Sequence, residues 1–581
     1  MEKRVLLFIF LTFLVLYAYQ ALFMPPVPPP DQQEAPAGIG VVDQATTEAE
    51  PEVAQGPADD LATAPAVETL PTAEVVQGDT QERDVRVETT NVVAVFTNRG
   101  ALLKSWRLKN YLDEFGEPLD LVATELMGAS PLPFSLVTSD PAVTSALNTA
   151  LFSVRGAPQG GIQTTPTALT FDYQDSAGLS ASKTFRLEPA SYVIEFQSRV
   201  TQGGEALQLQ IAWGPAVGNP RPSVTRWAKS DGGLTYGNGE LTRFSVDDIV
   251  GEPSHQGTFA YAGVDDHYFL TGAIHPGEST VTYRRITVPP ADPASGELYA
   301  VAWSIQGDNL PQPLAFFAGP KDFDVLEAVD LDLVRAIDFG IFAVIVVPLL
   351  RTLNWIYGFI GNYGWSIVLL TIIINAVMFP LRHKSVVSMR KMQEIQPEAK
   401  AIQERYAKLK SSDPAKQKMN QELMALYRER GVNPAGGCLP MLLTMPVLFA
   451  FYSLLTVAIE LRGAPFFLWI HDLSVPDPYF VTPVLMGASQ MWQQWMTPMA
   501  GVDPTQQKVM RLMPLMFMFF MLWLPAGVTL YWLVSNVWTI GQTYLTNYLI
   551  GPPIVKVVRP PAERRVKRAG AGQTKAAAEE K

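Results

Sequence analysis

The chain has 581 residues, 48% of them hydrophobic, and a mean hydropathy of +0.11, which together indicate a membrane protein with a substantial soluble part. Its formal net charge is −12. Eleven acidic residues and no basic residue lie between Met24 and Thr80, so the acidity belongs to a linker and not to a binding surface, and no DNA partner is expected. Cys438 is the only cysteine, which excludes an intramolecular disulfide.

Residues 1–24 are predicted to form an N-terminal transmembrane anchor. The apolar run Val5 to Met24 follows two basic residues, a pattern that also fits a signal peptide. We favour the anchor, because the run of about twenty residues exceeds a usual signal core and no small-x-small cleavage site precedes Pro25. Residues 25–80 are rich in Pro, Ala and Glu with few aromatic residues, which predicts a disordered acidic tether.

Residues 81–320 are predicted to form a β-sheet domain, because hydrophobic residues recur there with a period of two. Val85, Val87 and Thr89 alternate with polar neighbours. The longer runs of this kind are Leu102 to Leu108, Lys183 to Leu187, Tyr192 to Val200, Ala206 to Trp213 and Thr280 to Val288. Gly, Pro, Asn and Asp residues separate the runs, so the pattern predicts a large antiparallel β-sandwich outside the cytoplasm.

Asp265, Asp266 and His267 of this domain are candidate metal ligands. Adjacent residues of a strand point to opposite faces, and no second ligand group is spaced to complete a site. We therefore predict a structural role for the three residues, and no metal.

Residues 321–361 are predicted to be a linker and an interfacial amphipathic helix. The apolar segment Phe339 to Leu350 is too short to span a bilayer and contains Pro348. Residues 362–381, with the sequence NYGWSIVLLTIIINAVMFPL, then predict a transmembrane helix, because twenty residues without an ionisable side chain span the hydrocarbon core.

Two polar residues, Thr371 and Asn375, lie near the middle of this span. They are four residues apart on one helix face, so a polar partner must face them. Basic residues begin just beyond the span at Arg382, which places this end in the cytoplasm. Arg382 shares the same face and is long enough to reach partway along it. We favour the alternative in which its guanidinium extends to the lipid headgroups.

Residues 382–433 are predicted to form a cytoplasmic helical hairpin. Apolar residues follow the 4,3 spacing of a heptad seam on both sides of a turn at Ser411 to Pro414. The predicted seam includes Met392, Ile395, Ile402, Leu409, Leu423 and Leu426. Arg382 to Arg430 contains twelve basic and six acidic residues. Two interpretations stay open: a solvated coiled coil that obeys the positive-inside rule, or a dock for anionic lipid or ribosomal RNA.

Residues 434–550 are predicted to contain transmembrane helices 3 to 6. The four apolar segments are Cys438 to Ile459, Tyr479 to Met496, Leu512 to Leu524 and Val528 to Ile550. A tight outer turn at Pro525, Ala526 and Gly527 is expected to join the last two. Residues 551–581 form a basic tail, so the distribution of Lys and Arg predicts six spans with both termini in the cytoplasm.

The five internal spans carry no acidic, basic or histidine side chain within these boundaries. This weighs against proton relays, ion-coupled transport and intramembrane proteolysis, and we expect neither an enzyme nor a cofactor. The polar side chains are neutral: Thr371, Asn375, Gln490, Gln493, Gln494, Asn536 and Gln542. They fit two interpretations, either interhelical hydrogen bonds worth about 0.6 to 2 kcal/mol each, or the lining of a hydrated groove.

Several motifs in residues 433–536 closely resemble the YidC membrane-protein insertases. They are NPAGGCLP from Asn433 with Pro446 and Tyr452, APF from Ala464, LWIHDLS from Leu468, DPY from Asp477, MG from Met486, QQK from Gln506, and PAG with YWLVSN from Pro525 and Tyr531. The match covers residues 337–550 closely. The anchor, tether and β-sandwich resemble the long Gram-negative form of the family.

The resemblance implies a five-helix core around a hydrophilic groove that opens to cytoplasm and lipid and is closed toward the outside. Its clients would be nascent inner-membrane proteins in the lipid bilayer, inserted alone or beside the Sec translocon, with the ribosome as a further partner. The rival interpretation is a solute channel or transporter with a periplasmic carbohydrate-sensing domain.

The resemblance also assigns residues to the groove. The family's usual arginine falls at Asn375, and a glutamine that it often carries falls at Thr444. Thr371 matches the groove threonine, and Trp532 falls where an aromatic residue contacts the client. The residues expected to line the groove are Thr371, Asn375, Arg382, Gln490, Gln494, Tyr531 and Trp532.

Overall fold

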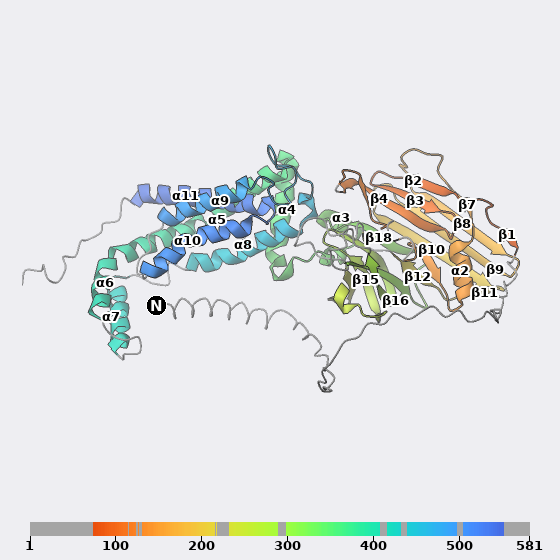
Figure 1. Cartoon of the computed structure of the whole chain (residues 1–581), viewed down its shortest axis with the longest axis horizontal. Helices are drawn as coiled ribbons and strands as arrows, with labels where there is room; N and C mark the ends of the chain where they lie inside the picture. Colours follow the sequence, from red (N-terminus) through yellow and green to blue (C-terminus); the bar gives the residue numbers. More distant parts are fainter. Residues whose placement is uncertain are drawn as a thin grey trace, which may run out of the picture. The chain divides into compact units, whose positions relative to one another are not determined.

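The computed structural model describes residues 74–550, except 114, 124–125, 127–129, 215–216, 218–231, 289–297, 407–414, 432–438 and 497–503. The predicted anchor, the basic tail and most of the predicted tether lie outside the described residues. In chain order, a β domain is followed by a helical domain (Figure 1).

The β domain contains two sheets, and its named strands pair antiparallel throughout the described residues. The smaller sheet has the order β2-β3-β4-β5, with β2 Asp84–Glu88, β3 Val92–Thr97, β4 Leu102–Leu112 and β5 Pro118–Asp120. The larger sheet has fourteen strands along the main path β1-β8-β9-β10-β18-β16-β15-β13-β14. Its strands are β1 Val75–Gln77, β6 Ser135–Val137, β7 Ser153–Arg155, β8 Thr167–Asp175, β9 Leu179–Leu187, β10 Val193–Gln202, β11 Glu205–Ala206, β12 Gln210–Trp213, β13 Gly232–Gly237, β14 Glu240–Ser245, β15 Ser254–Asp265, β16 Phe269–Val288, β17 Leu298–Gln306 and β18 Leu314–Pro320.

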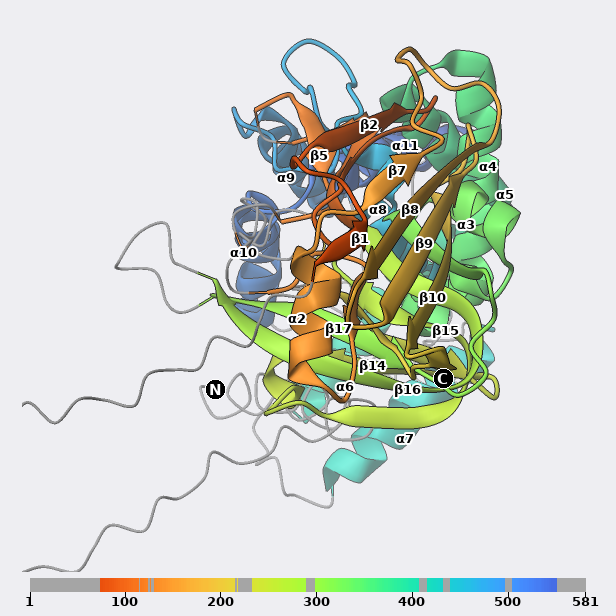
Figure 2. The ribbon, with the colours of Figure 1, turned by 90° about the vertical axis from the view of Figure 1, so that its right-hand side faces the viewer.

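The long strand β16 divides the larger sheet into two layers (Figure 2). Its first part pairs with β18 and its second part with β17. The change of direction lies at His275 and Gly277, both of which have positive φ. Aromatic rings fill the space between the layers: Phe134 lies 5.1 Å, between ring centroids, from both Phe185 and Trp213.

The smaller sheet packs onto the larger one through aromatic residues. The ring of Phe96 on β3 lies 4.8 Å from that of Phe185 on β9. Trp106 on β4 donates its indole N–H to the carbonyl of Ala318 on β18, 2.8 Å away, and both the ring and this bond are buried. The two sheets therefore share one core, as a β-sandwich requires.

Alternation located β4, β9, β10 and the second half of β16, and two details were wrong. The run Ala206 to Trp213 is not one strand, because it is divided between β11 and β12. The tether was predicted to extend to residue 80, but β1 begins at Val75 and pairs with β8. The three residues of β1 are exposed, so their side chains show no alternation and the pairing of their backbone defines the strand.

The three candidate metal ligands do not converge on one site. Each of Asp265, Asp266 and His267 has different contacts. Asp265 is fully buried between two cations, 2.6 Å from Arg243 Nη1 and 3.0 Å from Lys321 Nζ. Asp266 Oδ1 accepts hydrogen bonds from the backbone N–H groups of Tyr268 and Phe269 in the turn. His267 Nε2 donates to the carbonyl of Thr456 in the helical domain, 2.8 Å away. Each residue therefore has the structural role that was predicted.

The helices begin in the β domain and continue to the end of the described chain. They are α2 Pro141–Thr149, α3 Phe323–Val329, α4 Ala343–Ile360, α5 Tyr363–Glu394, α6 Gln396–Arg405, α7 Ala415–Glu429, α8 Leu439–Val457, α9 Val481–Met496, α10 Pro504–Met521 and α11 Ala526–Ile550. By length and composition, two helical stretches among the described residues could cross a membrane, Gly340–Ile360 and Tyr363–Ser388.

The length of the helix α4 differs from the prediction. Its apolar segment was expected to be too short to span a bilayer, but the helix runs for 18 residues through Pro348. Pro348 is the sixth residue of the helix, so its missing N–H removes the bond to the carbonyl of Val344, yet the helix continues through it. The helix ends at Gly361, which has the positive φ typical of a C-terminal glycine.

The last two helices also differ from their predicted bounds. The third predicted segment, Leu512 to Leu524, lies within and after α10, which begins earlier at Pro504 and ends at Met521. The turn was placed too late, since Ala526 and Gly527 already belong to α11.

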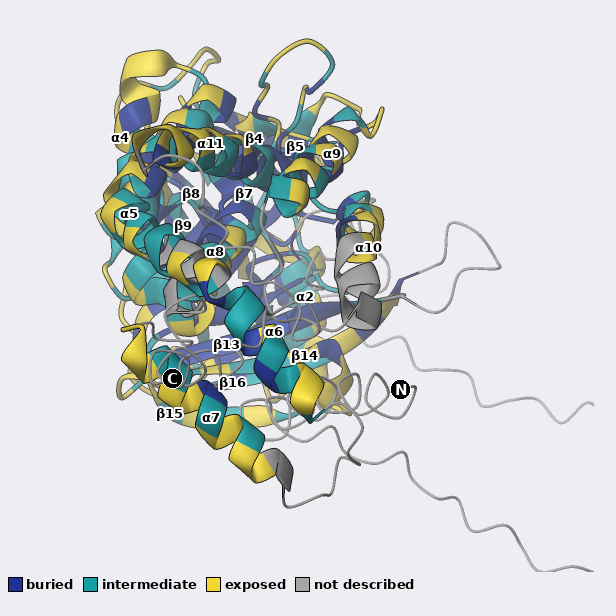
Figure 3. Ribbon diagram, turned by 90° about the vertical axis from the view of Figure 1, so that its left-hand side faces the viewer, coloured by how far each residue is buried: buried dark blue, intermediate teal, exposed yellow. Residues whose placement is uncertain are grey.

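The helices pack as a bundle in which α11 is central. It contacts α5 on one side and α9 on the other, while α10 packs on α9 and α8 packs most extensively on α4. Figure 3 shows exposed positions along α9 and α10. On α10 these include Leu512, Met516, Phe519 and Phe520, an apolar surface that suits contact with lipid.

Candidate functional site

One face of α5 carries the polar residues that the sequence singled out. Thr371 and Asn375 are buried, with exposed fractions of 0% and 2%. Thr371 Oγ1 donates to the carbonyl of Ile367, 2.6 Å away, and Asn375 Nδ2 donates to the carbonyl of Thr371 at 2.8 Å. These bonds within the helix leave Asn375 Oδ1 as the acceptor that faces its neighbours.

Arg382 supplies the donor for that acceptor. Its Nη1 lies 2.6 Å from Asn375 Oδ1 and 3.1 Å from Thr539 Oγ1 of α11. The favoured expectation that Arg382 extends to the headgroups is therefore wrong. Long side chains of a helix lean toward its N-terminus, and for Arg382 that direction is back along α5 toward Asn375. Among the described residues, the hydrogen bonds of this guanidinium go to neutral side chains.

The partners on α11 were not predicted from the sequence. Ser535 Oγ lies 3.5 Å from Asn375 Oδ1, and Thr539 is one helical turn further on. Serine and threonine in a span usually bond to their own helix, as Thr539 also does to the carbonyl of Ser535, so their presence alone does not indicate a partner on another helix. The signal that could have identified them is their spacing of four residues, which puts both hydroxyls on one face.

Other polar residues of the bundle join helices to one another. Asn536 Nδ2 donates to the carbonyl of Met486 and to Ser489 Oγ, so it links α11 to α9. Gln542 Nε2 lies 3.4 Å from the carbonyl of Phe379 on α5. The side-chain oxygens of Gln542 and Gln490 are buried without a hydrogen-bond partner in the described protein. Water is the natural partner for such oxygens, because hydrocarbon offers none.

The remaining predicted groove residues lie on α9 and α11. Gln494 is half-buried, one turn beyond Gln490. Tyr531 is buried and stacks on Phe451 of α8, with ring centroids 4.1 Å apart. The next residue, Trp532, is half-buried and lies 6.2 Å from Phe517 of α10. The structure thus brings Thr371, Asn375 and Arg382 together, whereas the two aromatic residues reach two different helices.

The predicted hairpin consists of α6 and α7. Ala399, Ile402 and Leu423 form its buried cluster, and Met419 and Leu426 pack against it. The pairs Arg405 with Glu422 and Arg430 with Glu398 join the two helices at their surfaces. Ile395 is buried between α5 and α6, and Met392 is half-buried near the end of α5. Leu409 lies outside the described residues.

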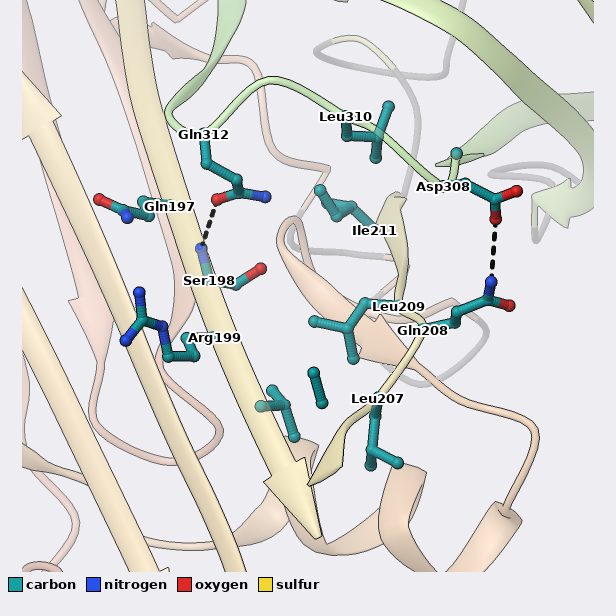
Figure 4. A pocket seen from close by; sticks show the side chains of 13 residues that line it. Gln197, Ser198, Arg199, Leu207, Gln208, Leu209, Ile211, Asp308, Leu310 and Gln312 are labelled. Atoms are coloured by element: carbon teal, nitrogen blue, oxygen red, sulfur yellow. Dashed lines mark hydrogen bonds between the residues drawn. The ribbon is translucent and has the colours of Figure 1, made fainter. Parts of the chain in front are cut away.

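A separate cleft of about 380 Å³ lies in the β domain beside β10 (Figure 4). Gln208 Nε2 donates to Asp308 Oδ1 across its rim at 2.9 Å, and Gln312 Oε1 accepts from the backbone N–H of Ser198 at 3.2 Å. Leucines line the space between these contacts. The lining contains neither histidine nor cysteine, and its polar side chains include those of Ser198, Arg199 and Asp308.

Two family models match nearly all of the described chain. The YidC periplasmic domain matches residues 84–352, and the 60Kd inner membrane protein family matches residues 355–551. The membrane protein insertase YidC of Geobacter metallireducens is 35% identical over 558 residues, which cover 94% of this chain and 98% of that protein. The chain belongs to the YidC membrane protein insertase family.

A second relative agrees with this assignment. The membrane protein insertase YidC of Syntrophus aciditrophicus is 34% identical over 566 residues, covering 94% of this chain and 99% of that protein. A solved structure described as an active YidC insertase with the first transmembrane domain resolved is 18% identical, covers 82% of this chain and 94% of that chain, and has a TM-score of 0.34.

Family membership confirms the resemblance and the predicted fold class, a polytopic helical membrane protein with a periplasmic antiparallel β-sandwich. It also confirms that the chain is not an enzyme, since the family is one of insertases. The rival interpretation as a channel or transporter finds no support among these relatives. The family acts on membrane proteins in the bilayer, and the periplasmic domain identifies the inner membrane as its location.

Proposed function

We propose that this chain inserts nascent inner-membrane proteins through a hydrated groove bordered by α5 and α11 and open to cytoplasm and lipid. One observation carries the proposal: Arg382 turns its guanidinium into the bundle, where its hydrogen bonds go to Asn375 and Thr539. A charge held among membrane helices costs several kcal/mol unless water or a counter-charge compensates it. A hydrated groove supplies the water, and an acidic segment of a client supplies the counter-charge.

The mechanism requires no covalent step. A groove that hydrates the middle of the bundle shortens the hydrocarbon barrier which a client's polar outer segment must cross. Meanwhile the client's apolar segment moves sideways into lipid. The positive charge of Arg382 favours clients with acidic outer segments, because opposite charges attract strongly where the dielectric constant is low.

In this chain the positive charge of the groove comes from Arg382, which is hydrogen-bonded to Asn375. The family usually carries an arginine at position 375, and this chain carries an amide. Arg382 Nη1 reaches the oxygen of that amide from two turns away, 2.6 Å distant. We infer that Arg382 replaces the charge that Asn375 lacks, while Thr371 fixes the orientation of the amide through its carbonyl.

Residues around this centre have supporting roles in the proposal. The unpartnered oxygens of Gln490 and Gln542 fit a hydrated wall. Gln494 extends that wall toward the cytoplasm. Tyr531 and Trp532 present aromatic surface toward α8 and α10, where the client's apolar segment would leave.

The proposed topology has six spans with both termini in the cytoplasm, and α4 along the outer surface of the membrane. Contacts of α4 support the last point: Arg351 pairs with Glu327 of α3 at 2.6 Å, and Asn354 lies 3.5 Å from Asp324 of α3. The middle of a membrane-spanning helix would not meet a helix that follows the β domain. Labelling of engineered cysteines tests the topology, with position 467 expected to react from outside and position 424 from the cytoplasm.

The proposed partners are the Sec translocon and the ribosome. The basic excess of the hairpin supports a cytoplasmic partner with negative charge, because ribosomal RNA and anionic lipid attract exposed Lys and Arg. Lys400, Lys418 and Arg428 of α6 and α7 are exposed. Binding of purified ribosomes to the full chain, with and without residues 395–426, tests this point.

The substitution Arg382→Gln tests the proposed function directly. In proteoliposomes it should slow insertion of a client with an acidic outer segment by about tenfold, the effect of losing one favourable charge interaction of about 1.4 kcal/mol. Insertion of the same client with a neutral outer segment should change little, and Arg382→Lys should retain most activity. Equal loss for both clients would contradict the proposed role of the charge.

A further inference from the structure

The loop of residues 462–480, here named the outer cap, holds the first turns of three membrane helices. The helices α5, α9 and α11 all begin beside it. The first N–H groups of a helix have no acceptor within that helix, and lipid supplies none. The acceptors that the cap offers therefore decide how firmly the three helix ends are held together.

Backbone carbonyls of the outer cap receive the start of α11. Ala526 N donates to the carbonyl of Val475 at 2.8 Å, and Gly527 N donates to the carbonyl of Leu473 at 2.9 Å. A side chain at position 527 would crowd the cap, since its Cβ would lie 3.3 Å from the oxygen of Leu473. This close approach explains why glycine occupies the position.

Asn362 fastens the start of α5 to the same loop. Its Nδ2 donates to the carbonyls of Pro465 and Phe466, each at 3.1 Å, while its Oδ1 accepts from the backbone N–H of Trp365 at 3.0 Å. Gly364 lies directly against the ring of Phe466, where a Cβ would overlap the ring.

Asp477 connects the cap to α9. Its Oδ2 accepts from the backbone N–H of Thr482 at 2.8 Å and from Thr482 Oγ1 at 2.9 Å. Its Oδ1 accepts from the backbone N–H of Tyr479 and from Trp469 Nε1, each at 3.0 Å. The residue is 1% exposed, and its two bonds to Thr482 are buried, whereas those to Tyr479 and Trp469 are partly buried. Burial raises the pKa of the Asp477 carboxyl, but these hydrogen bonds outweigh burial and hold the pKa below its usual value.

A pair of hydroxyls extends this connection to α11. Thr482 Oγ1 and Thr529 Oγ1 lie 3.1 Å apart, and both residues are buried. The chain of contacts therefore runs from Trp469 through Asp477 and Thr482 to Thr529. It joins the cap, α9 and α11 at their outer ends.

We propose that the outer cap is the seal that closes the insertase groove toward the outside, and that Asp477 is its positioning residue. The proposal rests on the proposed function, because a seal matters only if the bundle below it is hydrated. An ionised carboxylate suits the position, since it accepts four hydrogen bonds at once and lies beside the positive end of α9. Removing it frees the first turn of α9 and breaks the connection to Thr529.

The test uses the full chain with Cys438→Ser and a reporter cysteine at Ser535→Cys, beside Asn375. A membrane-impermeant maleimide is added from outside to spheroplasts, and from the cytoplasmic side to inverted vesicles. In the parent, the reporter should react from the cytoplasmic side only. Asp477→Ala should raise the rate of reaction from outside by about tenfold, because losing a charge-assisted hydrogen bond shifts the equilibrium between closed and open states by about that factor.

Asp472→Ala is the matched control. Asp472 lies in the same cap and carries the same charge, but the hydrogen bonds it accepts come from Ser474 within the loop. This variant should react as slowly from outside as the parent. Thr482→Val keeps the shape of α9 and removes only the hydroxyl, so it should give an intermediate rate. If Asp477→Ala does not fold, the rate at which the reporter cysteine reacts from outside in Thr482→Val tests the seal instead.

The outcomes separate the seal from the groove. A reporter that reacts from neither side in the parent would contradict the hydrated groove of the proposed function. A reporter that reacts from the cytoplasmic side but stays protected from outside in folded Asp477→Ala and Thr482→Val would overturn the seal alone.

Discussion

The cations around Asp265 in the β domain and the half-buried cation beside Asn375 in the helical bundle are held in opposite ways. In the β domain, Lys321 and Arg243 both lie within 3.0 Å of the fully buried carboxylate of Asp265. In the bundle, Arg382 is bonded to the neutral side chains of Asn375 and Thr539. A charge that is paired with an opposite charge is neutralised within the protein. A charge that is bonded only to neutral groups can still attract an acidic client segment.

This contrast explains why the two regions differ in function. The paired charges fix the base of the β domain, where Lys321 also donates to the carbonyl of Asp266. The charge of Arg382 is held in position by hydrogen bonds but is not neutralised by them. It therefore remains available to an acidic client segment.

The largest expected effect comes from breaking the buried pairing of the β domain. Asp265→Asn leaves two buried cations without their carboxylate, which should destabilise the domain by about 3–5 kcal/mol. The melting temperature of the purified full chain should fall by roughly 10 °C. Asp84→Asn is the control, because its pair with Lys104 is exposed and worth about 1 kcal/mol or less. Similar melting temperatures for Asp265→Asn and Asp84→Asn would contradict the claim that the carboxylate of Asp265 stabilises the β domain by neutralising buried cations.

The comparison extends to pH at Lys183, a side chain of the β domain that, like Arg382, donates to neutral groups. It is fully buried and donates to the carbonyls of Gly100 and Phe134, at 2.7 and 3.0 Å. Burial lowers the pKa of Lys183 to about 7. An unfolded lysine keeps a pKa of about 10.4, so between pH 7 and 10 the unfolded chain binds more protons than the folded one. The stability contribution of this group therefore rises with pH, by up to about 1.4 kcal/mol per unit.

Lys183→Met tests this sign. The difference in unfolding free energy between wild type and variant, measured by urea denaturation from pH 7.5 to 9.5, should grow in favour of the wild type as pH rises. A difference that is constant across this range would show that Lys183 is charged in the folded state.

The smallest effect is expected at an exposed pair of the hairpin. Arg430 Nη2 contacts both oxygens of Glu398, at 2.8 and 2.9 Å, but both side chains are partly exposed. Glu398→Gln should lower the free energy of unfolding by at most about 1 kcal/mol and leave client insertion unchanged.

Deletion of residues 395–426 of the hairpin should impair insertion, because it removes the proposed reception element. Normal insertion after the deletion would make the hairpin a connector only.

The sequence predicted the features that depend on local pattern. Alternation located β4, β9, β10 and the second half of β16, and the apolar lengths located α5, α9 and α11. The strands β8, β15 and β17 were not predicted. The spacing of Thr371, Asn375 and Arg382 correctly put all three on one face. The family motifs then identified the fold class, which periodicity alone does not specify.

The remaining features depend on contacts between distant residues. The strand β1 is ordered by pairing with β8, about a hundred residues later in the chain. The direction of Arg382 depends on acceptors at Asn375 and Thr539, and the second of these lies on another helix. The role of Asp477 needs Thr482 and Thr529 beside it, and the motif around Asp477 indicated only family membership. Sequence spacing does not show such partners across helices.

Moving the charge tests the central claim most directly. Insertion of a client with an acidic outer segment is measured in proteoliposomes for wild type, Arg382→Gln, and the double variant Asn375→Arg with Arg382→Gln. If Arg382 supplies the cation that position 375 lacks, the single variant should lose about tenfold and the double variant should recover most of the activity with a melting temperature close to that of the wild type. A double variant that folds but inserts no better than Arg382→Gln, or one that melts early because the arginine at position 375 is buried without water, would contradict the account.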